Sequence, residues 1–138
     1  MKPKLLLRIA SIIMLLHTLG HTMGALTWDQ APNKPIANVL QGMKSDHFDF
    51  FGRQVSLAMF YQGYGYGMIG VLLLIVVVLW LSANNITDIM TQKLLPWLIA
   101  FLAFFAIDEW IWFFPMPAIM SSVAAVLVFV GYLGSRRT

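Results

Sequence analysis

Long stretches without a charged side chain run through this sequence of 138 residues. Four such stretches are bounded by Arg8 and Asp29, Arg53 and Asp88, Lys93 and Asp108, and Glu109 and Arg136. Three of them reach or exceed the roughly 20 apolar residues that a helix needs to cross a bilayer. The remaining stretch is long enough only if two neighbouring carboxylates lie inside the membrane. The pattern predicts four membrane-spanning helices.

Composition supports a membrane protein and excludes several other classes. Hydrophobic residues make up 59% of the chain and charged residues only 11%, whereas about a quarter of the residues of a soluble domain are charged. A disordered chain or a nucleic-acid-binding protein would be far more polar. The chain has no cysteine, which excludes a disulfide scaffold and thiolate metal ligands. The apolar runs do not alternate with polar residues, so they predict helices rather than barrel strands.

The distribution of basic residues predicts the topology. Three basic residues lie on one side of the predicted spans, namely Lys34, Lys44 and Arg53. Six lie on the other side: Lys2, Lys4, Arg8, Lys93, Arg136 and Arg137. Because basic residues are enriched in cytoplasmic segments, we expect a multi-pass protein of the cell (inner) membrane with both termini in the cytoplasm. The net charge of +3 is thus interpreted as a topology signal, with no nucleic-acid partner.

The predicted fold is a single all-α domain over residues 1–138, a bundle of four transmembrane helices. The spans are expected at about residues 4–27, 51–82, 93–114 and 117–135, with an outer loop at residues 28–50. The first span is expected to be a retained helix rather than a cleaved signal peptide, because its apolar run is long. The second is too long for one crossing, so its front end should project from the bilayer or tilt.

Two further local patterns are informative. In the outer loop, apolar residues recur at helical spacing, which predicts a short amphipathic helix on the outer surface; they are Ile36, Val39, Leu40 and Met43. Between the second and third spans, Thr87 or Asp88 is expected to cap the next helix.

Two histidines of the first span share one helix face. His17 and His21 are four residues apart, so their side chains lie one above the other. Both fall in the outer leaflet, about 3 and 9 Å beyond the midplane. This spacing suits a divalent metal ion, as in helical zinc and iron sites. Hydrogen bonding to neighbouring helices and acid–base chemistry remain alternatives.

Asp108 and Glu109 in the third span lie at a similar depth. An ionised side chain near the bilayer centre costs about 2.5–3.5 kcal/mol, so it is rarely kept without a partner or a task. Adjacent helical residues differ in direction by about 100°, so only one of the two can face the bundle interior. We expect either an ion pair with Arg53 or a histidine, or a functional site. Glu109, Asp108 and His21 are the candidate catalytic groups, and His17, His21 and Glu109 the candidate metal ligands.

The outer end of the second span adds further candidates. Tyr61, Gln62, Tyr64 and Arg53 are predicted to line a ligand-binding cavity above the histidines, although tyrosines at this depth also form interfacial belts. His47 in the outer loop could supply a third imidazole or could be a solvated loop residue. No nucleophile elbow, phosphate-binding loop or redox dithiol is present.

In length, four-span layout and the pattern of Arg8, His17, Gly20, His21 and Gly24 in its first span, the chain resembles the DoxX-like small bacterial membrane proteins. The resemblance covers most of the chain and implies a four-helix fold in the inner membrane. Some members of that group are associated with membrane oxidoreductase systems. The paired histidines and the Asp-Glu pair depart from the group, so no catalytic residue is carried over from it.

Three functions are consistent with these features. The first is an outward-facing site in the outer leaflet that binds a metal ion or a small polar ligand. The second is an enzyme that performs acid–base chemistry on a lipid-like substrate. The third is a structural or partner subunit in which the polar groups only hold helices together. The expected partners are the lipid bilayer and a small-molecule or lipid-like ligand.

Overall fold

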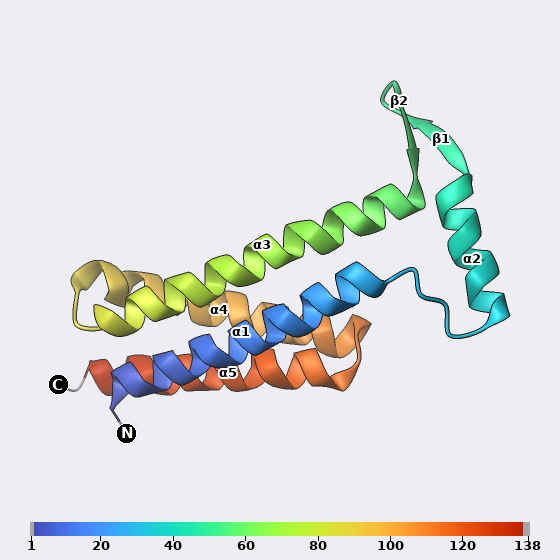
Figure 1. Cartoon of the computed structure of the whole chain (residues 1–138). Helices are drawn as coiled ribbons and strands as arrows, with labels where there is room; N and C mark the ends of the chain where they lie inside the picture. Colours follow the sequence, from blue (N-terminus) through green and yellow to red (C-terminus); the bar gives the residue numbers. More distant parts are fainter. Residues whose placement is uncertain (1, 137–138) are drawn as a thin grey trace. The chain divides into compact units, whose positions relative to one another are not determined.

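The computed structural model describes residues 2–136 and is almost entirely helical (Figure 1). Its elements are, in chain order, α1 (Pro3–Thr27), α2 (Lys34–Ser45), β1 (His47–Phe50), β2 (Arg53–Ser56), α3 (Leu57–Asn84), α4 (Ile89–Trp112) and α5 (Pro115–Ser135). All of the helices except α2 are long and apolar enough to cross a membrane. This confirms the prediction of a helical chain with four apolar helices, to which the structure adds a short β-hairpin.

The chain divides into two compact units. The four-helix unit combines the residues up to Thr18 with those from Leu72 onward, so it holds the first part of α1, the end of α3 and the whole of α4 and α5. The hairpin unit is Leu19–Val71, which comprises the end of α1, α2, both strands and the start of α3. The residues singled out in the sequence are therefore distributed over both units.

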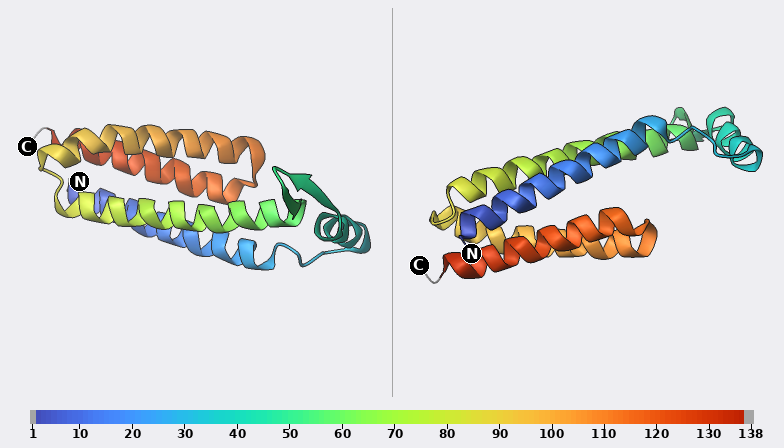
Figure 2. Two further views of the ribbon diagram at one scale, coloured as in Figure 1. Left: turned by 90° about the horizontal axis from the view of Figure 1, so that it is seen from above. Right: turned by 60° about the horizontal axis from the view of Figure 1, so that its bottom comes forward.

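The centre of the four-helix unit is apolar. Its largest fully buried apolar side chains are Leu7, Met14, Leu72, Leu79, Leu95, Leu102 and Val128. Helices α4 and α5 run antiparallel and side by side (Figure 2), because a tight turn joins them. Pro115 is the first residue of α5, where its missing N–H is not needed for a helical hydrogen bond.

Gly131 allows α1 and α5 to approach closely. A Cβ atom placed on Gly131 would lie 2.5 Å from Leu7 Cδ1 and 3.5 Å from Leu6 Cβ. The first of these distances is shorter than a carbon–carbon contact, so a side chain at this position would require either Leu7 to change rotamer or the helices to move apart. Small residues serve the same purpose in other membrane helix pairs.

The second span begins later than the sequence pattern indicates. Residues 47–56 form an antiparallel hairpin, and α3 begins at Leu57 rather than near residue 51. The hairpin turns at Phe51 and Gly52, whose φ angles are 52° and 79°; positive φ at both positions is typical of a type I′ turn. The Ser56 hydroxyl accepts the amide N–H of Met59, which satisfies a free donor at the start of α3.

Helix α2 confirms the helix predicted within the outer loop. The Asn33 side chain caps it by accepting the Ile36 N–H at 3.1 Å. Near its other end, Lys44 Nζ donates to Asp29 Oδ2 at 2.8 Å and lies 5.7 Å from the ring centre of Trp28. No residue of α2 is fully buried. Polar contacts therefore lie at both ends of α2, while on its apolar face Ile36 and Val39 are exposed and Leu40 and Met43 are half-buried.

Candidate functional site

A histidine and a glutamate meet inside the four-helix unit. His17 Nε2, on α1, lies 3.1 Å from Glu109 Oε1, on α4. The two residues are only 5% and 3% exposed, so the pair is shielded from solvent and from lipid. The sequence predicted that histidines of the first span and a carboxylate of the third would meet, and for His17 and Glu109 this is confirmed.

A serine on α5 completes the polar cluster. Ser121 Oγ lies 3.3 Å from His17 Nδ1 and is fully buried. On the ring face, Phe105 of α4 stacks with His17 at 6.0 Å between ring centres. If Glu109 is ionised, His17 Nε2–H donates to it and Ser121 Oγ–H donates to Nδ1, so both ring nitrogens are used. We call His17, Glu109 and Ser121 the polar cluster.

The second carboxylate oxygen of Glu109 lacks a donor. Glu109 Oε2 is buried and has no hydrogen-bond partner among residues 2–136. Leaving a buried acceptor unpaired costs about 1–3 kcal/mol, and more when the group is charged. Such atoms are rare in folded proteins and each calls for an explanation. Among the described residues, Glu109 Oε2 is thus the atom of the polar cluster that has no hydrogen bond.

The neighbouring acid, Asp108, points elsewhere. Asp108 is half-buried and makes no ion pair within residues 2–136. The roughly 100° between adjacent helical positions accounts for this difference. Glu109 is therefore the acid that faces the interior of the four-helix unit, a point that the sequence left open. Of the two predicted partners, Arg53 belongs to the hairpin unit, and within the four-helix unit Glu109 contacts the histidine, His17.

His21 has a different environment from His17. It belongs to the hairpin unit, where its Nε2 lies 3.0 Å from the carbonyl oxygen of Gly65 on α3. Because a carbonyl only accepts, Nε2 carries a proton and donates to it. Gly65 also brings the helices together, since a Cβ there would lie 3.4 Å from Ala25 Cβ. In the described structure His21 thus joins two helices of the hairpin unit.

The predicted ligand-binding residues of the second span are largely exposed. Tyr64 is 77% exposed, and Tyr61 packs on Trp28 with ring centres 5.0 Å apart. Gln62 is half-buried on α3. Arg53 lies at the start of β2, opposite Phe50, and is exposed. The structure places Tyr61 in an aromatic contact typical of a helix end.

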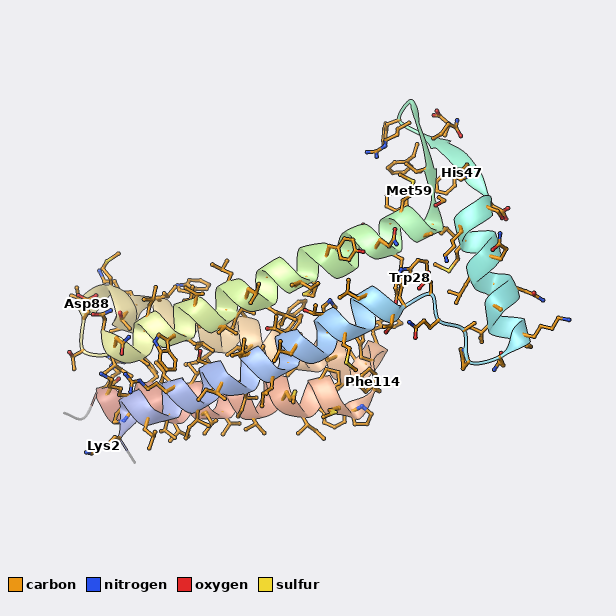
Figure 3. All side chains as sticks on the ribbon, viewed as in Figure 1. Lys2, Trp28, His47, Met59, Asp88 and Phe114 are labelled. Atoms are coloured by element: carbon orange, nitrogen blue, oxygen red, sulfur yellow. The ribbon has the colours of Figure 1, made fainter. Side chains whose placement is uncertain are left out.

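His47 is an exposed residue of the hairpin. It is the first residue of β1, next to the end of α2 (Figure 3), and its Nδ1 lies 2.9 Å from the Ser45 carbonyl oxygen. Across residues 2–136 no group of three or more His, Cys, Asp or Glu side chains is arranged to hold a metal ion. Of the expected metal ligands, His17 and Glu109 lie together in the four-helix unit, whereas His21 and His47 belong to the hairpin unit.

Ser121 was not among the residues predicted from the sequence. The signal was weak but present, because Ser121 and Ser122 are consecutive polar residues in an otherwise apolar span. Ser122 accepts a hydrogen bond from Trp110 Nε1 at 3.2 Å. The cluster follows the order serine, histidine, acid found in hydrolases, but Ser121 is fully buried in helix packing. A substrate carbonyl would not reach it without separation of the helices.

Comparison with known protein families, with curated proteins and with solved structures finds no match for this chain. The class of protein therefore follows from its own architecture. It is a helical protein with four helices able to cross a membrane. Its distinguishing feature is a buried polar cluster contributed by α1, α4 and α5.

Proposed function

We propose that this chain is a multi-pass protein of the cell (inner) membrane, with both termini in the cytoplasm, that binds a small polar ligand at Glu109. The ligand donates a hydrogen bond, or presents a small cationic group, to the second oxygen of the carboxylate. His17 and Ser121 hold the carboxylate in place. The membrane location is supported by the four apolar helices, the charge asymmetry of the sequence and the resemblance to DoxX-like proteins.

The unpaired oxygen of Glu109 carries this proposal. Oε1 is held by His17 at 3.1 Å, while Oε2 is buried without a donor in the described chain. A carboxylate that served only to join helices would be expected to use both oxygens, because an unpaired buried acceptor destabilises the fold. A donor supplied by a ligand removes that penalty. The arrangement favours a ligand with an N–H or O–H group.

The number of side chains that could coordinate a metal ion indicates the class of the ligand. A divalent metal ion normally takes three or four protein ligands, as zinc does, and no set of three or more His, Cys, Asp or Glu occurs among the described residues. A single carboxylate backed by an imidazole suits an ammonium or guanidinium group better. A small polar ligand is therefore favoured over the divalent metal ion that the histidine spacing suggests.

The test is ligand-dependent thermal stability. Purified full-length protein in detergent would be titrated with methylammonium, methylguanidinium and, separately, zinc chloride. A ligand that binds only the folded state raises its stability, by about 2.7 kcal/mol at a concentration one hundred times its Kd. We expect one of the two organic cations to raise the Tm of the unsubstituted protein.

Two variants make this test specific. Glu109→Gln keeps an oxygen for His17 but removes the charge, so its Tm should no longer respond. Asp108→Asn removes a carboxylate from the adjacent position of α4 and should respond like the unsubstituted protein. An equal response in Glu109→Gln would show that the ligand binds elsewhere. A response to zinc alone would favour the metal-ion interpretation, and no response at all would favour a structural role.

Acid–base chemistry on a lipid-like substrate is a second candidate. The direct contact between His17 Nε2 and Glu109 Oε1 places an imidazole and a carboxylate within proton-transfer distance. Such an enzyme would require the substrate to enter between helices. Lipid density beside Glu109 in an experimental structure would favour it.

A further inference from the structure

A second polar feature of the four-helix unit lies far from Glu109. Arg8 on α1 is nine residues before His17, or about 13 Å along the helix. Its guanidinium group lies 5.1 Å from the ring centre of Trp80 on α3, and Nη2 donates to Asn84 Oδ1 at 3.1 Å. Arg8 Nε is buried without a hydrogen-bond partner among residues 2–136.

Within residues 2–136 no carboxylate pairs with the charge of Arg8. The ion pairs of the described residues are His17–Glu109 and Lys44–Asp29, and neither includes Arg8. Its two contacts, with an amide and an aromatic ring, carry no opposite charge. A cation that is partly enclosed in apolar surroundings is stabilised by an anion. Arg8 therefore offers binding capacity to an anionic group from outside the chain.

An apolar groove begins beside Arg8. It has a volume of about 300 Å³ and lies between α1 and α3, with Ile12 and Leu15 on one side and Val77, Trp80 and Leu81 on the other. Trp80 thus contacts Arg8 and lines the groove as well. Ser11 also lines it, but its hydroxyl donates to the Val76 carbonyl at 2.9 Å. The groove therefore presents almost no free polar group.

The groove and the arginine are aligned along one helix face. Arg8, Ile12 and Leu15 are spaced at i, i+4 and i+7, so they follow one stripe of α1. The stripe is about 10 Å long, against a leaflet depth of about 15 Å. A ligand that fits has an anionic group at one end and an apolar chain extending from it. In a membrane that description matches an acidic phospholipid.

We infer that Arg8 and the α1–α3 groove form a binding site for an anionic phospholipid, with the phosphate on Arg8 and one acyl chain along Ile12, Leu15 and Val77. Trp80 forms the wall at the level of the headgroup, where tryptophan is favoured. Basic pockets between membrane helices bind acidic lipids for the same physical reasons. The site is separate from the polar cluster and shares with the proposed function only the membrane location.

Lipid binding to the purified protein tests this inference. Full-length protein would be stripped of lipid in detergent and then given phosphatidylglycerol or phosphatidylcholine with identical acyl chains, and bound lipid would be counted by native mass spectrometry. We expect phosphatidylglycerol to bind about fivefold more tightly, the factor for one basic side chain near an acidic headgroup. Arg8→Gln should bind the two lipids equally.

Two matched controls separate charge from shape. Arg136 also stacks on an aromatic ring, that of Tyr132 at 5.6 Å, but it does not line the groove; Arg136→Gln should keep the preference. Val77→Phe fills the groove and should weaken the binding of both lipids at least fivefold. Leu74→Phe adds the same bulk at an exposed position of α3 outside the groove and should bind like the unsubstituted protein.

Three results would overturn the inference. The first is equal binding of both lipids by the unsubstituted protein, which requires no variant to fold. The second is a preference for phosphatidylglycerol that survives in Arg8→Gln with unchanged helicity by circular dichroism. The third is displacement of phosphatidylglycerol by millimolar inorganic phosphate, which would identify a free anion as the ligand.

Discussion

Among residues 2–136, His17 is the residue that makes a direct polar contact with the buried carboxylate of Glu109, and Ser121 in turn contacts His17. Removing the hydrogen-bond donor of a buried carboxylate is strongly destabilising, because the charge then stays buried without compensation. The imidazole also satisfies two hydrogen bonds at once, one to Glu109 and one to Ser121. The stability of the unit should therefore depend on the two residues together rather than on each separately.

The first prediction concerns this dependence. His17→Phe keeps the ring volume and the contact with Phe105 but leaves both oxygens of Glu109 without a donor. We expect it to lower the free energy of unfolding by about 3 kcal/mol. Adding Glu109→Gln to the same protein removes the buried charge and should recover at least half of that loss. Unfolding in sodium dodecyl sulfate, followed by circular dichroism, measures both values.

The control for this pair is Asp108→Asn, which changes a carboxylate outside the polar cluster. In the His17→Phe background it should recover nothing. Additive effects of His17→Phe and Glu109→Gln, within about 0.5 kcal/mol, would mean that the residues are energetically independent. That result would contradict the coupling.

The sequence predicted part of this site. The contact of His17 with Glu109 followed from depth, because helical rise places both residues in the same layer. The choice between Asp108 and Glu109 could not be predicted, since it depends on how α4 is rotated about its axis. Ser121 was missed because a serine in an apolar span is common as a packing residue. His21 was grouped with His17 by spacing, but its Nε2 contacts the Gly65 carbonyl.

Among the elements, α1 and α5 depend on glycine for their packing. Gly131→Ala places a methyl group 2.5 Å from Leu7 Cδ1, so the helices must move apart or Leu7 must change rotamer. We expect a loss of about 1–3 kcal/mol in the free energy of unfolding, as for other overpacked positions. Unfolding in sodium dodecyl sulfate, followed by circular dichroism, measures this loss.

Gly70→Ala is the matched control for Gly131→Ala. A Cβ at Gly70 on α3 meets no atom within 4 Å, and alanine is the better helix former by about 1 kcal/mol. This variant should therefore be as stable as the unsubstituted protein or more stable. Equal effects of the two substitutions would contradict the close approach at Gly131.

The Asp29–Lys44 pair links the end of α1 to α2. The hydrogen bond from Lys44 and its positive charge lower the pKa of Asp29 below its ordinary value of 3.8. Because the pKa is lowered in the folded state, the pair stabilises the fold above pH 3.8, and this contribution is lost as the pH falls through the folded value. Titration of the Asp29 carboxyl by nuclear magnetic resonance should show the lowered pKa.

In Lys44→Met the pKa of Asp29 should return to its ordinary value. Lys34→Met, at the opposite end of α2, should leave it low. A low pKa that persists in Lys44→Met would contradict the assigned cause. The pair lies outside the helices that can span a membrane, so the titration reports on water-exposed groups.

The elements themselves were largely predictable from the sequence. The charge-free stretches predicted the four long helices, and apolar residues at helical spacing predicted α2. Both patterns depend only on the local sequence. Asp88 caps α4 through the N–H groups of Met90 and Thr91, as expected for one of the two candidates. The β-hairpin at residues 47–56 was not predicted. Its phenylalanines extend the apolar pattern of α3, and Phe51, unlike glycine, gives no indication of a positive φ.

For the molecule as a whole, the arrangement of charges predicts a defined orientation in the membrane. The sequence contains no cysteine, so a single introduced cysteine can be labelled without background. In intact cells, Lys34→Cys on α2 should react with a membrane-impermeant maleimide. Lys93→Cys on α4 should react with the same maleimide only after the cells are permeabilised. The reverse pattern would contradict the proposed topology.

The polar cluster also has a geometric consequence for helices in lipid. In a bilayer the hydrophobic effect gives little preference for one vertical alignment of apolar helices over another, because lipid tails are as apolar as the side chains. His17 bonds to α4 through one nitrogen and to α5 through the other. A slip of α1 by a single turn, about 5.4 Å, breaks both bonds at once. One imidazole therefore sets the vertical register of three helices.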